Sequence, residues 1–286
     1  MILKLRQLAR RRRAALCVAL FSWLSACTSV PLPEGNSLSS HAGMSPSRGT
    51  PMPAKLRVDS TAVLTAQTVR IVPTSTQIDS RAFDPNDLAL VTNAIDRALC
   101  TDLSDRFKIV AINQPADLIV HATVTNIVAT NRSAAVTSTV ASFGGSAALG
   151  IPIPRLPIGL GGLAIEAEAV GEDGLQRAAM LWSRGANMIT TRARVSGVGD
   201  AYSLSSAFAA AFSRMLVTGK DPFNRMLAIP SMQRLRASLG GDPKYDACKA
   251  FGTAPGIPGI VAARFGLPPA WTDKGAGLPS RDGAAH

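Results

Sequence analysis

The chain has 286 residues, and its 30 Lys and Arg outnumber its 19 Asp and Glu, so the formal net charge is +11. Six of these cations lie in residues 1–26, and the rest of the chain carries 24 Lys and Arg against 19 Asp and Glu, a net charge of +5. Aromatic residues make up 5% of the chain. A weakly basic surface with few stacking side chains is not typical of nucleic-acid-binding proteins, and we expect no nucleic acid partner.

The N-terminus has the pattern of a secretory signal. Six Lys and Arg within residues 4–13 form a basic head, and residues 14–23 are apolar except for Ser22. Ten helical residues rise about 15 Å, roughly half the hydrocarbon thickness of a bilayer, so this segment is too short for a stable membrane span. We therefore predict that residues 1–26 are a signal peptide, which is removed.

The residues that follow the apolar core resemble a bacterial lipobox. In Leu24-Ser25-Ala26-Cys27 the cysteine occupies the position that becomes the first mature residue of such lipoproteins. The resemblance implies a diacylglycerol on the Cys27 thiol and a further acyl chain, such as palmitate, on the new amino group. Two or more chains anchor a protein durably, because each buried methylene contributes about 0.8 kcal/mol. The alternative is an ordinary cysteine behind an ordinary signal peptide.

The resemblance to lipoproteins also suggests a destination and a division of the chain. Thr28 follows the anchor, and in lipoproteins of enteric bacteria a residue other than aspartate at this position permits transfer to the outer membrane. We therefore expect a periplasm-facing, lipid-anchored protein of the outer membrane rather than of the inner membrane. The composition predicts four further parts: a flexible Pro- and Ser-rich tether from Cys27 to residue 54, a folded domain over 55–220, a short helical extension over 221–252, and a disordered Pro- and Gly-rich tail over 253–286.

The first half of the folded domain predicts three strands and a helix. Residues 68–72 form a β-rich run that ends before Pro73. Asp84 and Pro85 are an N-cap and a first-turn residue, and apolar side chains then recur at helical spacing to about residue 105, which predicts a long amphipathic helix. Residues 107–112 predict a second strand, and the alternating pattern of residues 117–130 predicts a third.

The second half predicts a hairpin and a closing helix. Residues 163–170 alternate between apolar and polar, an acidic glycine turn follows, and residues 175–183 return as the partner strand. From about Asp200 to Leu216 the apolar residues follow helical spacing, with Gly219 as a stop. Two short helices are predicted over 222–227 and 231–239. Residues 131–162, rich in glycine and proline, are interpreted as a loop that interrupts the sheet.

Cysteine usage agrees with an exported protein. Cys17 leaves with the signal peptide and Cys27 carries lipid, so Cys100 and Cys248 are the thiols of the mature body. In an oxidising compartment these two favour one disulfide, and two unrelated buried thiols are the alternative. Closing a loop of about 148 residues stabilises a fold by roughly 4 to 5 kcal/mol in the loop-entropy model.

No motif in the chain specifies a reaction. His41, His121 and His286 form no cluster with metal-ligand spacing, and the sequence contains no nucleophile elbow, zincin helix or dinucleotide fingerprint. We expect no catalytic residue, no metal and no cofactor. Glu166 and Glu168 point to the same face of a predicted strand and form a candidate carboxylate pair for a hydrolase. The favoured interpretation is that both are solvated and pair with arginines of the next strand, such as Arg177.

The order of these parts resembles a family of bacterial lipoproteins known as domain of unknown function 3313. The resemblance covers roughly residues 55–217 and rests on three segments, 115–120, 165–174 and 207–216. It implies no assigned activity. The chain departs from the family pattern in the segment 143–162 and in the C-terminal extension that carries Cys248.

We expect an α+β fold, a two-layer α/β sandwich in which an antiparallel or mixed sheet of about five strands carries two helices on one face. The function that we predict is a non-enzymatic, membrane-tethered binding or assembly module of the bacterial envelope, whose partner is an envelope protein or a second copy of the chain. The alternative is a self-assembling or membrane-inserting structural lipoprotein that uses residues 131–162. A hydrolase that uses Glu166 and Glu168 is the third hypothesis.

Overall fold

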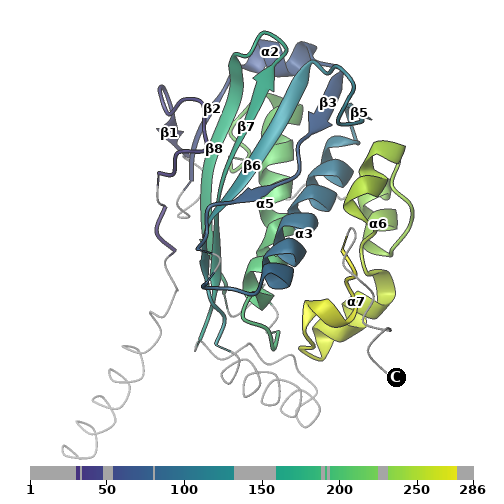
Figure 1. Ribbon diagram of the computed structural model, residues 1–286. Helices are drawn as coiled ribbons and strands as arrows, with labels where there is room; N and C mark the ends of the chain where they lie inside the picture. The colour runs from purple at the N-terminus through teal and green to yellow at the C-terminus, as the bar shows by residue number, and fades with distance from the viewer. Residues whose placement is uncertain are drawn as a thin grey trace, which may run out of the picture.

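The computed structural model describes residues 30–32, 34–47, 54–79, 81–131, 159–187, 191, 194–224 and 231–275 (Figure 1). Within these ranges the chain forms one mixed β-sheet, and two long helices cover one of its faces. The expected α+β fold is confirmed. The predicted signal peptide, Cys27, and nearly all of the glycine-rich segment 131–162 lie outside the described residues.

The sheet is antiparallel on one side and parallel on the other. In the described residues its order from edge to edge is β1 (Ser45–Pro46), β2 (Ala54–Val58), β8 (Gln176–Gly185), β7 (Gly162–Gly171), β6 (Leu118–Val128), β3 (Thr68–Ile71) and β5 (Lys108–Val110), and β4 (Ser75–Thr76) pairs with β6 beside this path. Neighbours from β1 to β6 are antiparallel, whereas β3 is parallel to both β5 and β6. The centre is therefore the three-stranded meander of the long strands β6, β7 and β8.

The strand count corrects the sequence-based expectation. The five predicted strands correspond to β3, β5, β6, β7 and β8, but the described sheet has eight strands. The additional strands β1, β2 and β4 are short, and β1 and β4 have two residues each. Their extended conformation comes from pairing with β2, β8 and β6, respectively, which no local pattern reveals.

The two long helices are the predicted ones. Helix α3 (Pro85–Leu103) begins behind Asp84, whose side chain accepts a hydrogen bond from the Asn86 amide at 2.8 Å. Helix α5 (Gly199–Thr218) ends at Gly219, which has the left-handed φ of 63° that glycine adopts without strain. A further short helix, α2 (Ser60–Thr65), was not expected and is capped by the side chain of Asp59.

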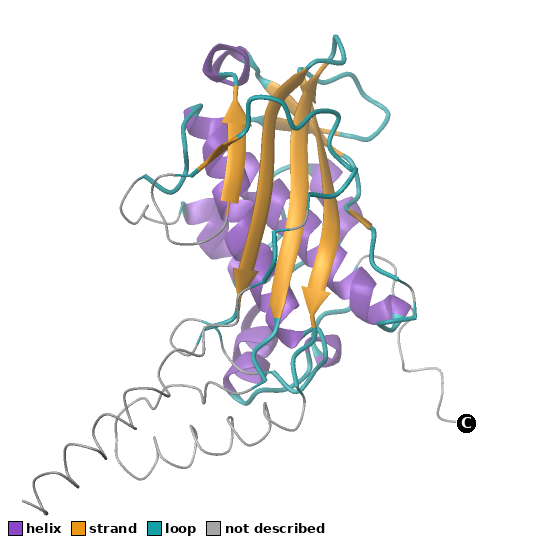
Figure 2. Ribbon diagram, turned by 90° about the vertical axis from the view of Figure 1, so that its left-hand side faces the viewer, coloured by secondary structure: helices purple, strands orange, loops and turns teal. Residues whose placement is uncertain are grey.

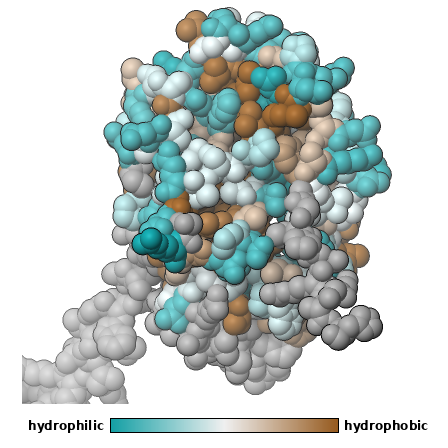
Figure 3. Space-filling model, viewed as in Figure 1, coloured by the Kyte–Doolittle hydropathy of each residue, from teal (hydrophilic) through white to brown (hydrophobic). Residues whose placement is uncertain are grey.

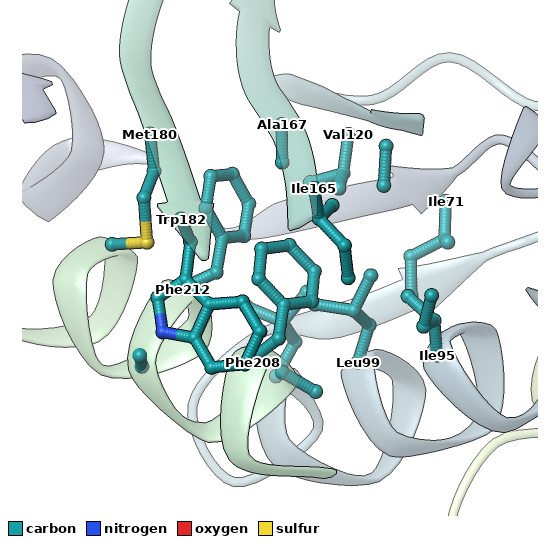
Figure 4. Packing of buried hydrophobic residues seen from close by; sticks show 14 of the residues in the cluster. Ile71, Ile95, Leu99, Val120, Ile165, Ala167, Met180, Trp182, Phe208 and Phe212 are labelled. Atoms are coloured by element: carbon teal, nitrogen blue, oxygen red, sulfur yellow. The ribbon is translucent and has the colours of Figure 1, made fainter. Parts of the chain in front are cut away.

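The main core lies between the sheet and these helices. Phe208 and Phe212 of α5 and Trp182 of β8 are buried together, and the ring centroids of Trp182 and Phe208 lie 5.7 Å apart (Figure 4). Ile95 and Leu99 of α3 extend this cluster toward β3 and β6. Large aromatic and branched side chains remove much apolar surface from water, so this layer is the principal source of stability.

A third layer lies behind the helices and corrects a second expectation. Helix α6 (Met232–Ser238), the short 3₁₀-helices η1 (Asp246–Phe251) and η2 (Pro269–Trp271), and helix α7 (Gly256–Arg264) form a C-terminal extension, part of which contacts α3. The predicted disordered tail over 253–286 is therefore wrong as far as residue 275. The order does not come from local periodicity but from long-range links to α3, namely a disulfide and a buried ion pair.

Candidate functional site

The segment after the predicted lipidation site lies on the sheet face opposite the helices. We call residues 30–47 the strap, of which the structure describes all except residue 33. In Figure 2 the strands face the viewer, with the helices behind them, and loops cross in front of the strands. Leu38 of the strap packs with Ala179 and Leu181 of β8. The prediction of a flexible tether is wrong for this segment, because its small apolar and polar side chains find partners on the sheet.

Glu166 is the centre of the contact between strap and sheet. Its carboxylate accepts hydrogen bonds from the Gly35 amide at 2.5 Å, from the Ser37 amide at 3.1 Å and from the Ser37 hydroxyl. The Nε2 atom of His41 lies 3.6 Å from Oε1 of Glu166. Glu166 is 1% exposed. A carboxylate this deeply buried is tolerated because several donors replace its water.

Glu168 makes the same kind of contact one pleat further along β7. Its Oε2 atom accepts hydrogen bonds from the Ser39 amide at 2.8 Å, from the Ser39 hydroxyl at 2.7 Å and from Nε2 of Gln176 at 2.7 Å. Gln176 also donates from Nε2 to the Ser40 carbonyl at 3.0 Å. Glu168 is 6% exposed. The two glutamates therefore bind every second residue of the strap from Gly35 to Ser39, and the alternation of β7 sets their spacing.

These contacts correct the interpretation of the carboxylate pair. Glu166 and Glu168 are neither solvated nor paired with Arg177, which instead bridges Asp173 and Asp59 at the hairpin end of the sheet. The strap covers both carboxylates. Sequence reasoning missed the strap residues because a serine-rich segment far away in the chain carries no signal for a specific sheet contact.

The strap needs a glycine where it crosses Glu166. A Cβ atom on Gly35 would lie 2.9 Å from Oε2 and 3.0 Å from Cδ of Glu166. A larger residue would require the Glu166 carboxylate or the strap to shift, and it would therefore disturb the hydrogen bond from the Gly35 amide. Close approach of backbone and side chain is a common reason for glycine.

The first described residue of the strap is docked at one end of the sheet. The Val30 carbonyl accepts a hydrogen bond from the Ser183 hydroxyl at 3.1 Å, and Val30 is buried. A Cβ atom on Gly162 would lie 2.1 Å from Cγ2 of Val30, so the two residues are in close contact. Three residues of extended chain span at most about 11 Å. Val30 follows Cys27 by three residues in the sequence.

A pocket of about 550 Å³ lies on the other side of the molecule, between α3, α5 and the C-terminal extension. Small residues of both helices line it, among them Ala94 and Ala98 of α3 and Ser203 and Ser206 of α5. The extension contributes Arg234 and Cys248, among others. Because the helices present small side chains here, the extension rests over them without filling the space.

Buried charges hold the last part of the extension against the helices at the pocket. Asp273 accepts hydrogen bonds from both terminal nitrogens of Arg97 and from the Tyr202 hydroxyl at 2.5 Å. Burial, followed by the negative charge of Asp273, raises the pKa of Tyr202. The guanidinium of Arg194 lies over the Tyr202 ring, 5.2 Å from its centroid. These contacts join α3, α5 and the residues after η2, and a fully paired bidentate contact of this kind fixes their geometry.

The predicted disulfide is present. Cys100 of α3 and Cys248 of η1 are bonded, with their Cα atoms 5.8 Å apart and a sequence separation of 148. Asp102, two residues further along α3, forms an ion pair with Nε of Arg234 at 2.6 Å. The extension is thus fixed to α3 by a covalent bond and by charge pairs near both of its ends.

Two buried aspartates of α3 are expected to make stability depend on pH. Burial raises the pKa of Asp96 to about 6 and that of Asp102 to about 7. The folded state therefore binds protons that the unfolded state has lost, and the free energy of unfolding falls as the pH rises from about 4 to 7. Asp102→Asn should flatten this decline, by up to about 1.4 kcal/mol per pH unit. Urea unfolding at a series of pH values measures it.

The exposed Asp242 offers a matched control for this prediction. Asp242→Asn removes an exposed carboxylate of the C-terminal extension and leaves the buried carboxylates of α3 in place, so its pH profile should follow that of the parent protein. If the free energy of unfolding of Asp102→Asn fell with pH as steeply as that of the parent protein between about pH 4 and 7, Asp102 would not be a source of the pH dependence.

The described residues show no cluster for metal chemistry and no membrane-crossing helix. In these residues no group of three or more His, Cys, Asp or Glu is arranged to hold a metal ion. His41 lies beside Glu166, and His121 of β6 pairs in register with Glu168 on β7. Of the helices in the described ranges, none combines the length and apolar character that spanning a bilayer requires.

The fold and the strap define an α+β domain whose N-terminal segment is part of the folded unit. The chain belongs to the family described as protein of unknown function (DUF3313), whose model matches residues 34–212. The matched range begins in the strap, about twenty residues earlier than the resemblance in the sequence suggested, and ends within α5. It includes Glu166 and Glu168, together with the strap residues that bind them.

Two further comparisons add little. No curated protein matches the chain. Among solved structures, the chain is similar to a PelC variant, crystallised as a dodecamer, from Paraburkholderia phytofirmans, with 9% sequence identity and a TM-score of 0.33 over 58% of this chain and 97% of that chain. A similarity at this level supports no argument about function.

Proposed function

We propose that this protein is a lipid-anchored, non-enzymatic binding module of the bacterial envelope, facing the periplasm from the outer membrane. The observation that supports the proposal is the docked strap. Val30 is fixed to β8 three residues after Cys27, and Glu166 and Glu168 fix the residues that follow. An acylated Cys27 would hold the domain directly at the membrane surface, where even weak contacts gain from a high local concentration.

The pocket behind the helices is the proposed place of binding. Its volume of about 550 Å³ lies in the range of ligand sites in proteins, which is about 300 to 1,000 Å³. It combines an apolar floor of alanines with arginine and hydroxyl groups, and therefore suits a ligand or a protein segment that has both an apolar and a polar part. The hydrolase hypothesis has less support, because the strap occupies the hydrogen-bonding positions of Glu166 and Glu168.

Metabolic labelling tests the anchor. Cells that express the protein are fed an alkyne-bearing palmitate, and the label is followed by gel and by membrane fractionation. The proposal predicts a labelled, membrane-bound protein, and predicts that Cys27→Ala is unlabelled and leaves the membrane fraction. Label that persists in Cys27→Ala, or an unlabelled parent protein, would refute the anchor.

Site-specific photocrosslinking tests the binding site. A photoreactive phenylalanine analogue replaces Ser206, which is exposed and lines the pocket, or Glu172, which is exposed in the hairpin turn as a control. The proposal predicts that position 206 captures a defined envelope component, that position 172 does not, and that Cys27→Ala reduces the capture. Equal products at both positions would contradict a role of the pocket. Capture of the same chain alone would favour the self-assembly alternative.

A further inference from the structure

Exposed apolar side chains are concentrated in the C-terminal extension. Among the described residues, eight of the eleven large hydrophobic side chains that are exposed belong to residues 231–275. Apolar groups also interrupt the polar surface on the face that Figure 3 shows. A concentration of this kind in one part of a chain is typical of an interaction surface, whereas single exposed apolar residues are not.

Helix α7 buries its small residues and exposes its large apolar ones, the reverse of an ordinary surface helix. Its buried residues are the small ones, Gly256, Gly259 and Ala262. Its large residues point outward: Ile257 is 61% exposed, and Ile260 and Val261 are about half exposed. Surface helices normally bury such a stripe against the core. The small residues fit the helix closely against the extension, and the large ones remain available for another surface.

Two exposed aromatic residues follow the stripe along the chain. Phe265 follows the last turn of α7 on the same side, four residues after Val261, and Trp271 of η2 is 62% exposed. We call Ile257, Ile260, Val261, Phe265 and Trp271 the α7 apolar face.

The exposed charged residues of the segment that carries the α7 apolar face are basic. From residue 250 to residue 275 the charged residues are Arg264, Asp273 and Lys274. Arg264 and Lys274 are exposed, whereas Asp273 is buried against Arg97. An apolar stripe with an exposed tryptophan and basic neighbours matches the interface of an anionic bilayer, where indole rings and basic side chains both partition favourably.

The α7 apolar face lies at the end of the molecule where the strap begins. The Val195 amide donates to the Gly266 carbonyl at 2.8 Å, and the Thr130 amide donates to the Gly197 carbonyl at 2.8 Å. Thr130 lies just after the end of β6. The last residue of β6 pairs with Gly162, and Gly162 is in contact with Val30. Figure 1 shows α7 near this same lower end of the sheet. Val30 and the C-terminal end of α7 therefore lie at one end of the domain.

We propose that the α7 apolar face docks on the surface of an anionic lipid bilayer, as a second membrane contact beside Cys27. Two contacts at one end fix the orientation of the domain, with the hairpin turn between β7 and β8 pointing away from the membrane. The orientation rests on the proposed anchor, whereas the docking itself requires no acyl chain. The two proposals can therefore fail separately.

Vesicle flotation tests the docking without the anchor. The full mature chain, residues 27–286 with Cys27→Ser, is produced without the signal peptide and mixed with vesicles of phosphatidylethanolamine and phosphatidylglycerol. We expect binding that weakens at least about tenfold in the double variant Ile260→Glu with Phe265→Glu, because charge replaces buried apolar surface. Circular dichroism and thermal unfolding show that each variant is folded.

The matched control uses α6. Met232 and Leu235 are exposed hydrophobic residues of the same extension but lie outside the α7 apolar face. The double variant Met232→Glu with Leu235→Glu should bind vesicles within about twofold of the parent, since its lost contacts do not involve the bilayer. A parent that does not bind, or two double variants that are equally weak or equally strong, would overturn the proposal.

Tryptophan fluorescence reports the contact directly. Trp23 is lost with the signal peptide and Trp182 is buried in the core, so Trp271 is the exposed tryptophan of the mature chain. Its emission should shift to the blue when vesicles bind, and brominated lipids should quench it. An unchanged spectrum would contradict the docking. Concentration-dependent dimers that disappear in the Ile260→Glu and Phe265→Glu variant would assign the face to a second copy and overturn the proposal.

Discussion

Glu166→Ala is expected to release the strap and to lower the free energy of unfolding by about 2 to 4 kcal/mol, because it leaves the amides of Gly35 and Ser37 without their acceptor. Part of the loss is recovered when the freed strap exposes these donors to water, so detachment should precede global unfolding. Two measurements check the prediction: urea unfolding of the mature chain, and digestion by a nonspecific protease, which should cut within residues 30–47 in the variant.

Glu172→Ala is the matched control, because Glu172 is an exposed glutamate in the turn after the same strand. It should change stability by less than about 0.5 kcal/mol and leave the strap resistant to protease. Glu168→Ala should release the strap as well. Since both glutamates hold the same segment, the double variant Glu166→Ala with Glu168→Ala should lose less free energy of unfolding than the two single variants lose together. Full additivity, or a strap that resists protease in Glu166→Ala, would show that the glutamates do not hold it.

Replacing both Cys100 and Cys248 by serine is expected to cost roughly 4 to 5 kcal/mol in the loop-entropy model, because the bridge closes a loop of 148 residues. The same substitution should loosen η1 and with it the attachment of the extension to α3. Urea unfolding of the parent and the double variant, each with and without reducing agent, measures the effect.

Reduction supplies the control for this prediction. The reduced parent and the double serine variant lack the same bond, so their unfolding curves should coincide, and reducing agent should not affect the variant. If the α7 apolar face is positioned by the bridge, reduction should also weaken vesicle binding. A parent protein whose stability is unaffected by reduction would contradict a stabilising bridge.

The elements that the sequence predicts well are those that local chemistry specifies. Asp84 and Pro85 mark the start of α3, and Gly219 marks the end of α5, because caps and left-handed glycines act within one turn. The hairpin of β7 and β8 follows from alternation and an acidic glycine turn. The disulfide followed from counting the cysteines that remain after export.

The elements that the sequence misses depend on contacts between distant residues. The strap is a Pro- and Ser-rich segment whose order comes from Glu166 and Glu168, some 130 residues later. The interpretation of the two glutamates as solvated was wrong for a related reason. Alternation identifies the face of the sheet opposite the core, but not what covers that face. Helix α7 was hidden because its buried residues are glycine and alanine, so the usual apolar periodicity points outward.

The central claim is that the chain after Cys27 is docked on the sheet and holds the domain at the membrane. Hydrogen–deuterium exchange of the lipidated protein in membranes tests this claim most directly. The account predicts that peptides covering residues 30–47 exchange slowly, with the amides of Gly35, Ser37 and Ser39 protected by their hydrogen bonds to Glu166 and Glu168. Exchange in this segment as fast as in an unstructured peptide would contradict it and would restore the free tether.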